Sequence, residues 1–273
     1  MTAWSSLRRR RFAVVRLFEI AFGITTWSGA MFACGRFGFD TAPQVRDGPA
    51  DSGRGDDGTM LDNRLPPPDI PPRPDAFACQ PRMPVYLNFE GQTLTQGAPD
   101  ATANTAPWLA QSSVTVPAFA AGAPDRAQQI ATLTAAFVET LAPSGVQIVT
   151  TRPAAPPYAM LIIGGALGTF GGASSGGFGI FDCMQQATHD IGWIADGQPP
   201  QYTANLGAGI LGMGVGLTGT TDPQDCMCGW GPPCALTLSR CSFGTAVGRD
   251  TATCPALPAT QNELATLRAT YCQ

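Results

Sequence analysis

Cysteine is the residue type that most constrains how this chain can fold. The chain has nine cysteines in 273 residues, and eight of them lie between positions 79 and 272. Their spacing lacks a cytosolic zinc-ribbon pattern and therefore indicates an oxidising compartment. We expect these eight residues to form disulfides: Cys79, Cys183, Cys226, Cys228, Cys234, Cys241, Cys254 and Cys272. Many pairings are possible, which leaves the connectivity open.

The first 33 residues have the features of an export signal. Four arginines at 8–11 precede an apolar segment that ends in small residues near Ala33. The run from Arg9 to Phe12 resembles the core of a twin-arginine signal, so the Sec and Tat routes both stay open. An uncleaved membrane-anchoring helix is the alternative, because the segment approaches spanning length.

Cys34 follows this signal in a context that resembles a bacterial lipobox, which predicts a lipidated cysteine. Lipidation of Cys34 would leave an even number of cysteines to pair; a discarded or free Cys34 is the alternative. Residues 34–78 are rich in Pro, Asp and Gly and bury too little apolar surface to fold, so they form a tether. The expected location is the outer membrane or cell surface, as a lipoprotein, or the extracellular space.

The charge of the chain excludes two classes of partner. All 16 basic residues are Arg, and five of them lie in residues 1–33 with one acidic residue. Residues 34–273 therefore hold 11 Arg against 19 acidic residues, without a basic patch. Such a chain is not expected to bind nucleic acid or an anionic membrane surface, and a lipid anchor or the signal would be its only membrane contact.

Residues 79–273 have the pattern of an α+β domain. Strands are expected where apolar and β-branched runs are bounded by Gly or Pro: 85–90, 146–151, 158–163 and 191–195. The run 158–163 is apolar throughout, as a central strand buried on both faces would be.

Two helices and two loops are expected around these strands. A helix over 124–141 has Ile130, Leu133 and Phe137 on one face, and an amphipathic helix over 259–271 closes the chain. The thirty residues after Gly91 have the composition of a long surface excursion. The glycine-rich residues 164–179 are interpreted as a surface loop, because no Lys or helix follows as a phosphate cradle requires.

Residues 205–227 form an apolar, glycine-rich run that ends in a polar turn and a Cys-Met pair. This run resembles the active-site helix and Met-turn of the metzincin family of zincin metallopeptidases. The family pattern is A-H-E-x-x-H-x-x-G-L-x-H, followed by a tight turn that contains Met. Ala208, Gly216, Leu217 and Met227 fit this pattern.

The positions that carry chemistry in the family are replaced. The histidine positions hold Gly209, Met213 and Gly219, and the glutamate position holds Ile210. In the family the histidines bind Zn²⁺ and the glutamate moves a proton of the metal-bound water. Glycine and isoleucine have no ligating atom, and the Met thioether suits Zn²⁺ poorly. The resemblance therefore implies a degenerate member without zinc, another cofactor or catalysis.

The resemblance covers about residues 83–230 and implies a zincin-like α+β fold. It comprises a twisted mixed sheet, a helix in the N-terminal part, a degenerate active-site helix, a Met-turn and a disulfide-rich C-terminal segment. Its function would be that of a secreted or surface-anchored pseudopeptidase, a monomer that binds extended peptides beside an edge strand.

Two alternative functions stay open. An active zinc metalloendopeptidase would need other ligands, such as the lone His189 with nearby Asp residues, or a four-cysteine site. The cysteines of that site would be Cys226, Cys228, Cys234 and Cys241. The other alternative is a disulfide-stapled structural or binding domain of the bacterial envelope.

Overall fold

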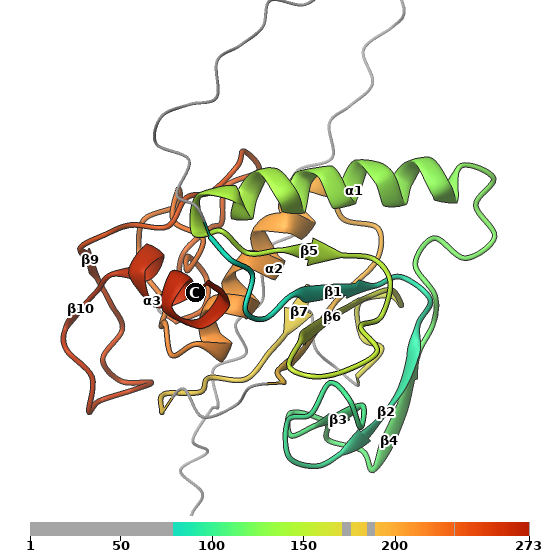
Figure 1. The fold of residues 1–273 in the computed structure, drawn as a ribbon, viewed down its shortest axis with the longest axis horizontal. Helices are drawn as coiled ribbons and strands as arrows, with labels where there is room; N and C mark the ends of the chain where they lie inside the picture. The colour runs from blue at the N-terminus through green and yellow to red at the C-terminus, as the bar shows by residue number, and fades with distance from the viewer. Residues whose placement is uncertain (1–78, 171–175, 185–188, 232, 273) are drawn as a thin grey trace, which may run out of the picture. The chain divides into compact units, whose positions relative to one another are not determined.

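The computed structural model describes residues 79–170, 176–184, 189–231 and 233–272. The predicted export signal (1–33), the lipidation site Cys34 and the tether (34–78) lie outside the described residues, as does part of the glycine-rich loop. The described residues have an α+β fold with three α-helices and several sheets (Figure 1). None of these helices has the length and apolar character that a membrane crossing requires.

The main sheet has five strands in the order β5-β1-β6-β8-β7. Their bounds are Val85–Asn88 (β1), Ile148–Val149 (β5), Ala159–Ile163 (β6), Gly177–Phe178 (β7) and Ile191–Ile194 (β8). The first four strands of the order are parallel, and β7 pairs antiparallel with β8. Every residue of β1, β6 and β8 is buried, as expected for strands covered on both faces.

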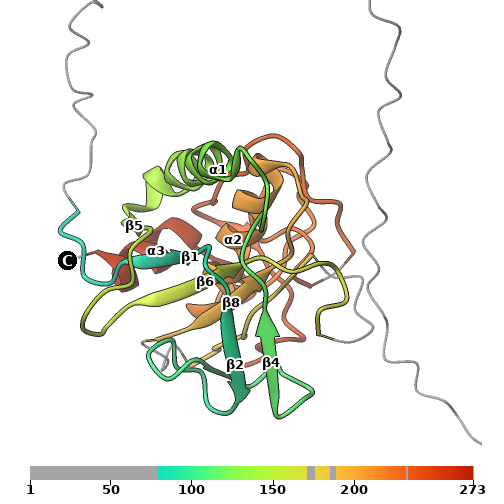
Figure 2. The ribbon, with the colours of Figure 1, turned by 90° about the vertical axis from the view of Figure 1, so that its right-hand side faces the viewer.

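Two helices cover one face of this sheet. Helices α1 (Arg126–Leu141) and α2 (Pro200–Gly214) lie on the same side (Figure 2). Alternate strand residues such as Leu87, Leu161 and Ile194 point into this core together with Phe137 of α1. Helix α1 corresponds to the helix predicted over 124–141 and begins two residues later, at Arg126.

A second, smaller sheet covers the opposite face and corrects the expectation of a long surface excursion after Gly91. It has the order β3-β2-β4, with β2 at Gln92–Gln96, β3 at Thr105–Ala106 and β4 at Ser113–Val116. Leu94 and Val116 are buried against a core that contains Ile162 and Trp193 of the main sheet. The small sheet forms because it buries these apolar residues, although its exposed face is rich in Thr and Ser.

The C-terminal region contains little regular structure. The strands β9 (Val247–Gly248) and β10 (Thr260–Gln261) pair antiparallel, and α3 (Glu263–Tyr271) follows. The helix predicted over 259–271 therefore begins at residue 263. Its start is fixed by Asn262, whose side chain accepts a hydrogen bond from the Ala265 N–H.

Disulfides replace regular structure as the framework of this region and confirm the expectation that the cysteines pair. The bonds are Cys79–Cys272, Cys183–Cys254, Cys226–Cys241 and Cys228–Cys234. Two of them use the four cysteines that the zinc alternative required. Four disulfides indicate an oxidising environment, extracellular or in the cell envelope.

Candidate functional site

Helix α2 is an unusual helix because glycines occupy its interior. Each glycine lowers intrinsic helix stability by about 1 kcal/mol relative to alanine, so packing must hold the helix together. The glycines admit close neighbours: a Cβ on Gly207 would collide with the Phe137 ring of α1. Twelve consecutive residues of α2, from Thr203 to Gly214, are buried. The glycines therefore allow neighbouring segments to approach α2 closely, and the helix lies deep in the domain.

Two positions of the family pattern, Gly209 and Gly219, lie against Trp230. A Cβ on Gly209 would collide with Trp230 Nε1 and would lie 2.7 Å from the carbonyl oxygen of Cys226. A Cβ on Gly219 would lie 2.5 Å from the carbonyl carbon of Trp230 and would collide with the Gly231 nitrogen. Two of the three positions that hold histidine in the family pattern thus lie against Trp230.

The turn after α2 brings the predicted Met-turn residue beneath the helix. Gly216 adopts φ 84°, and the Leu217 N–H donates to the Gly212 carbonyl over 2.9 Å, which ends the helix sharply. Met227 is fully buried, and a Cβ on Gly212 would collide with its sulfur. Met227 therefore packs against α2 within the main core.

The other two replaced positions face the sheet. Cβ atoms built on Gly177 and Gly179 would lie 3.1 and 2.8 Å from Ile210, and the second would lie 2.9 Å from Met213 Cε. Ile210 and Met213 are both buried. They are apolar packing residues between α2 and the segment that contains β7.

Trp230 spans the space between α2 and β7. The pyrrole edge of its ring meets Gly209, and Cη2 at the far end lies 3.7 Å from a Cβ built on Gly177. The residue is partly buried, yet Nε1 is fully buried and has no hydrogen-bond acceptor among the described residues. The indole thus lies against α2 at Gly209, one of the positions that hold histidine in the family pattern.

The sequence predicted no role for Trp230. A tryptophan between two glycines, Gly229 and Gly231, inside the short Cys228–Cys234 loop was the available signal. The contact between Trp230 and α2 could not be inferred from the sequence, because it depends on the disulfide connectivity and on where the loop folds back.

Two buried carboxyl groups, Asp225 and Glu263, are linked by hydrogen bonds to the backbone at Met227 and, through Gln261, to the backbone at Thr218. Asp225 accepts a hydrogen bond from the Met227 N–H over 2.7 Å and shares a side-chain hydrogen bond with Glu263. Gln261 donates to Glu263 over 2.7 Å and bonds both backbone groups of Thr218. Burial raises the pKa of Glu263 to about 8, with the nearby Asp225 charge adding to the shift, and burial also raises the pKa of Asp225. The pair therefore holds a proton at neutral pH.

The lone histidine lies beside a second buried carboxyl group. Nδ1 of His189 and Oδ1 of Asp190 are buried and have no hydrogen-bond partner among the described residues, and a Cβ on Gly214 would collide with Asp190 Oδ2. Burial raises the pKa of Asp190 to about 7, and the charge of Asp182 adds to the shift. Across the described ranges, no three His, Cys, Asp or Glu side chains are grouped so that they could hold a metal ion.

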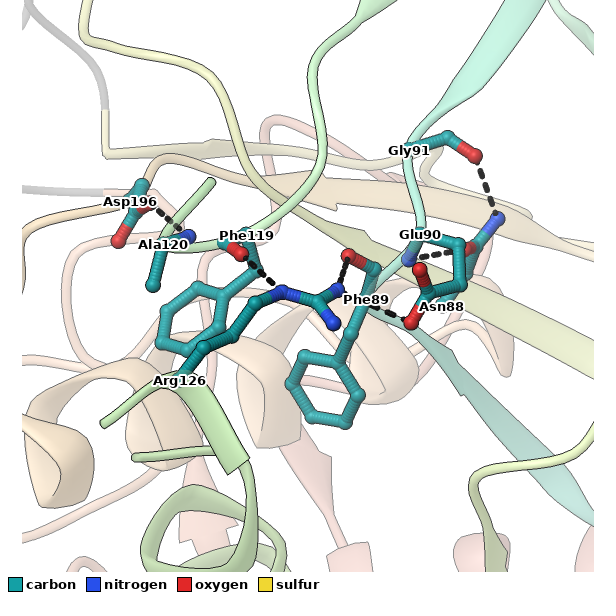
Figure 3. Close-up of polar contacts among 8 residues, drawn as sticks. All are labelled: Asn88, Phe89, Glu90, Gly91, Phe119, Ala120, Arg126 and Asp196. Carbon is teal, nitrogen blue, oxygen red and sulfur yellow. Dashed lines mark hydrogen bonds and ion pairs between the residues drawn. The ribbon is translucent and has the colours of Figure 1, made fainter. Parts of the chain in front are cut away.

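A polar cluster at the ends of β1 and β8 has a structural role (Figure 3). Arg126 at the start of α1 donates to the carbonyl oxygens of Phe89 and Phe119, each over 2.8 Å, and to Glu90 Oε1 over 2.9 Å. Asp196 after β8 accepts from the Ala120 N–H over 2.6 Å. These hydrogen bonds hold the segment before α1 against the sheet. The Arg126 guanidinium takes part in three of them.

Comparison with protein-family models, with curated proteins and with solved structures finds no match to this chain.

Proposed function

We propose that this protein is an exported zincin-like scaffold without peptidase chemistry, which binds extended peptides beside β7 and α2. The strand order supports the scaffold. Four parallel strands are followed by the antiparallel outer strand β7, with the long helix α2 packed under it and Met227 beneath that helix. A twisted sheet with an edge strand next to the active-site helix is what the family resemblance implies.

One observation carries the proposal: two positions that hold histidine in the family, Gly209 and Gly219, both lie against Trp230, Gly209 against its indole and Gly219 against its backbone. The residues there do not fit zinc. A histidine at 209 would have to displace both the Trp230 indole and the Cys226 carbonyl. The Glu position holds the buried Ile210, which cannot accept a proton. We therefore derive no metal-dependent step for this chain.

The binding activity is assigned to the side of the main sheet where an edge strand lies next to α2, as the family resemblance implies. An extended peptide that pairs with such a strand gains main-chain hydrogen bonds, and alternate side chains then face the helix side. Gly177 of β7 faces α2 and Trp230, whereas Phe178 stacks with Trp108 and Trp193 on the other face. The aromatic stack holds β7 in position.

The proposed location follows from the disulfides and the N-terminal sequence. The oxidising environment that the disulfides indicate agrees with an export signal over 1–33. Lipid on Cys34 and the tether 34–78 would place the domain at the cell surface. Mass spectrometry of the native protein tests this, since a diacylated N-terminal cysteine is expected.

The function is tested on the mature protein with metal analysis, a protease assay and a peptide array. We expect no stoichiometric zinc, no chelator-sensitive cleavage, and binding of a subset of extended peptides. N-methylation of alternate peptide amides separates strand addition from side-chain binding, because one of the two registers should abolish binding and the other should not. Zinc-dependent cleavage would refute the pseudopeptidase. A protein that binds no peptide would instead be the structural envelope domain.

A further inference from the structure

The strand β4 forms one edge of the small sheet β3-β2-β4, and none of the described strands pairs with its outer side. Ser113 and Thr115 are exposed, Val114 is partly buried and Val116 is buried. Figure 2 shows β2 and β4 extending away from helices α1 and α2. Among the described residues, the outer side of β4 is therefore an open strand edge at the surface of the domain.

The hydrogen bonds of the small sheet fix which main-chain groups of β4 point outward. The Thr95 N–H donates over 3.0 Å to a carbonyl just before β3, whereas the Gln96 N–H donates over 3.0 Å to a carbonyl just before β4. Thr95 thus points away from β4, and it lies opposite Ser113. Antiparallel pairs alternate between those that bond each other and those whose groups point away. The N–H and C=O groups of Ser113 and Thr115 therefore point toward the open edge.

This edge lacks the charges that usually keep an edge strand unpaired. Across the described ranges, no hydrogen bond from outside the sheet reaches the main chain of Ser113 or Thr115. Proteins protect such edges with charged side chains, bulges or proline. The strands of the small sheet contain no charged residue, and residues 101–124 contain none either. Pro117 directly after β4 limits any added pairing to a short strand.

The charge of the chain bears on which partner fits this edge. Residues 34–273 have an excess of acidic residues, so two copies of the chain repel each other over most of their surfaces. The uncharged small sheet is a place where two copies can meet without opposed carboxylates. The edge is also its own complement, because each outward N–H can meet an outward C=O of the same strand in an antiparallel copy.

We propose that β4 is a self-association site, at which two copies of the chain pair antiparallel about a two-fold axis through Val114. Ser113 of each copy then bonds Thr115 of the other, which gives about four main-chain hydrogen bonds. The two Val114 side chains face each other on the core side, where Val114 already packs against the core that contains Leu94. Both copies use the same edge, so the pairing closes as a dimer and does not continue into a fibre.

Other registers satisfy fewer of these groups. A shift of one residue would bring the core-side residues of one copy opposite the exposed residues of the other. A shift of two residues places either Pro117, which lacks an N–H, or Gln111, which precedes the strand, opposite an edge-facing residue. The contact is small, so a weak dimer is expected. It differs from the monomer that the family resemblance implies, and it is independent of the proposed peptide binding.

The first test compares two substitutions at Thr115 in the disulfide-intact mature protein by sedimentation equilibrium. The wild type should show a monomer–dimer equilibrium. Thr115→Pro removes the outward N–H and should raise the dimer dissociation constant at least tenfold. Thr115→Ala keeps this N–H and should change the constant less than threefold. A wild type that stays monomeric up to its solubility limit, or equal constants for the two variants, overturns the proposal.

The second test uses the wild-type chain, so it does not depend on how a variant folds. Amide hydrogen exchange is followed by NMR in dilute and in concentrated protein. Exchange of the Ser113 and Thr115 amides should be at least tenfold slower in the concentrated sample. The Val114 amide, which points toward β2, is the internal control and should not change.

Two results of the exchange experiment would overturn the proposal. A dimer in which the Ser113 and Thr115 amides still exchange rapidly would use another surface. Slow exchange of these amides at every concentration would mean that residues 34–78 of the same chain cover the edge. Neither result bears on the binding of peptides beside α2, which the peptide array tests separately.

Discussion

At the scale of the residue, the absence of a side chain at Gly209 allows the Trp230 indole to pack against α2. An alanine in a helix interior is normally about 1 kcal/mol better than glycine, yet here its Cβ meets Trp230 and the Cys226 carbonyl. Gly209→Ala should therefore lower the free energy of unfolding by about 1–3 kcal/mol, the usual cost of overpacking. Urea denaturation measures this. Gly248→Ala, where a Cβ would meet nothing within 4 Å, should change stability by less than about 0.5 kcal/mol. A higher free energy of unfolding in Gly209→Ala would contradict the contact between the Trp230 indole and α2.

At the scale of the element, Glu263 joins α3 to the turns that follow α2. A carboxyl whose pKa is higher in the folded protein binds more protons when folded. Its stabilising contribution is complete below its ordinary pKa, about 4.5, and is lost as the pH rises through about 8. The free energy of unfolding should therefore fall over this window. Glu263→Gln should reduce this slope, with the remainder coming from Asp190 and Asp225, whose pKa values are also raised. Denaturation curves from pH 4 to 9 test this, and Glu139→Gln, exposed on α1, should leave the slope unchanged. Equal slopes in both variants would rule out a proton held by Glu263.

At the scale of the whole molecule, the disulfide Cys79–Cys272 joins the two ends of the described domain across 193 residues. Cross-links that close long loops restrict the unfolded chain most. Replacing both cysteines by alanine should lower the free energy of unfolding by about 2–5 kcal/mol. The same replacement at Cys228 and Cys234, which close a separation of six residues, should cost less. Guanidinium denaturation compares the two, and a larger loss for the short loop would contradict the entropic account.

The sequence predicted those parts of the fold whose signal is local. The apolar run of β6 and the stripe of α1 containing Leu133 and Phe137 are periodic or continuous, and both elements formed with boundaries shifted by one or two residues. The small sheet β3-β2-β4 was missed. Leu94, Ala106 and Val116 of its strands are buried in a core that contains the distant Trp193, and such long-range contacts leave no local pattern.

That this region derives from a zinc site stays a prediction, and the residue that packs there could not be predicted from the sequence. The spacing of Gly209, Gly219 and Met227 indicated which residues would gather near α2. Trp230 entered this site through a loop whose path depends on the Cys226–Cys241 and Cys228–Cys234 bonds. Because the pairing was open at the level of sequence, the residue that fills the site could not be named.

The bond between Cys79 and Cys272 also has a mechanical consequence. A pull applied to the chain at residue 79 and at residue 272 would pass through one covalent cross-link and would not load the sheet between them. In a pulling experiment with handles at these two positions, the oxidised domain should add almost no contour length. After reduction, the same force should extend the chain. The domain would therefore keep its shape under tension on its ends, for as long as this bond stays oxidised.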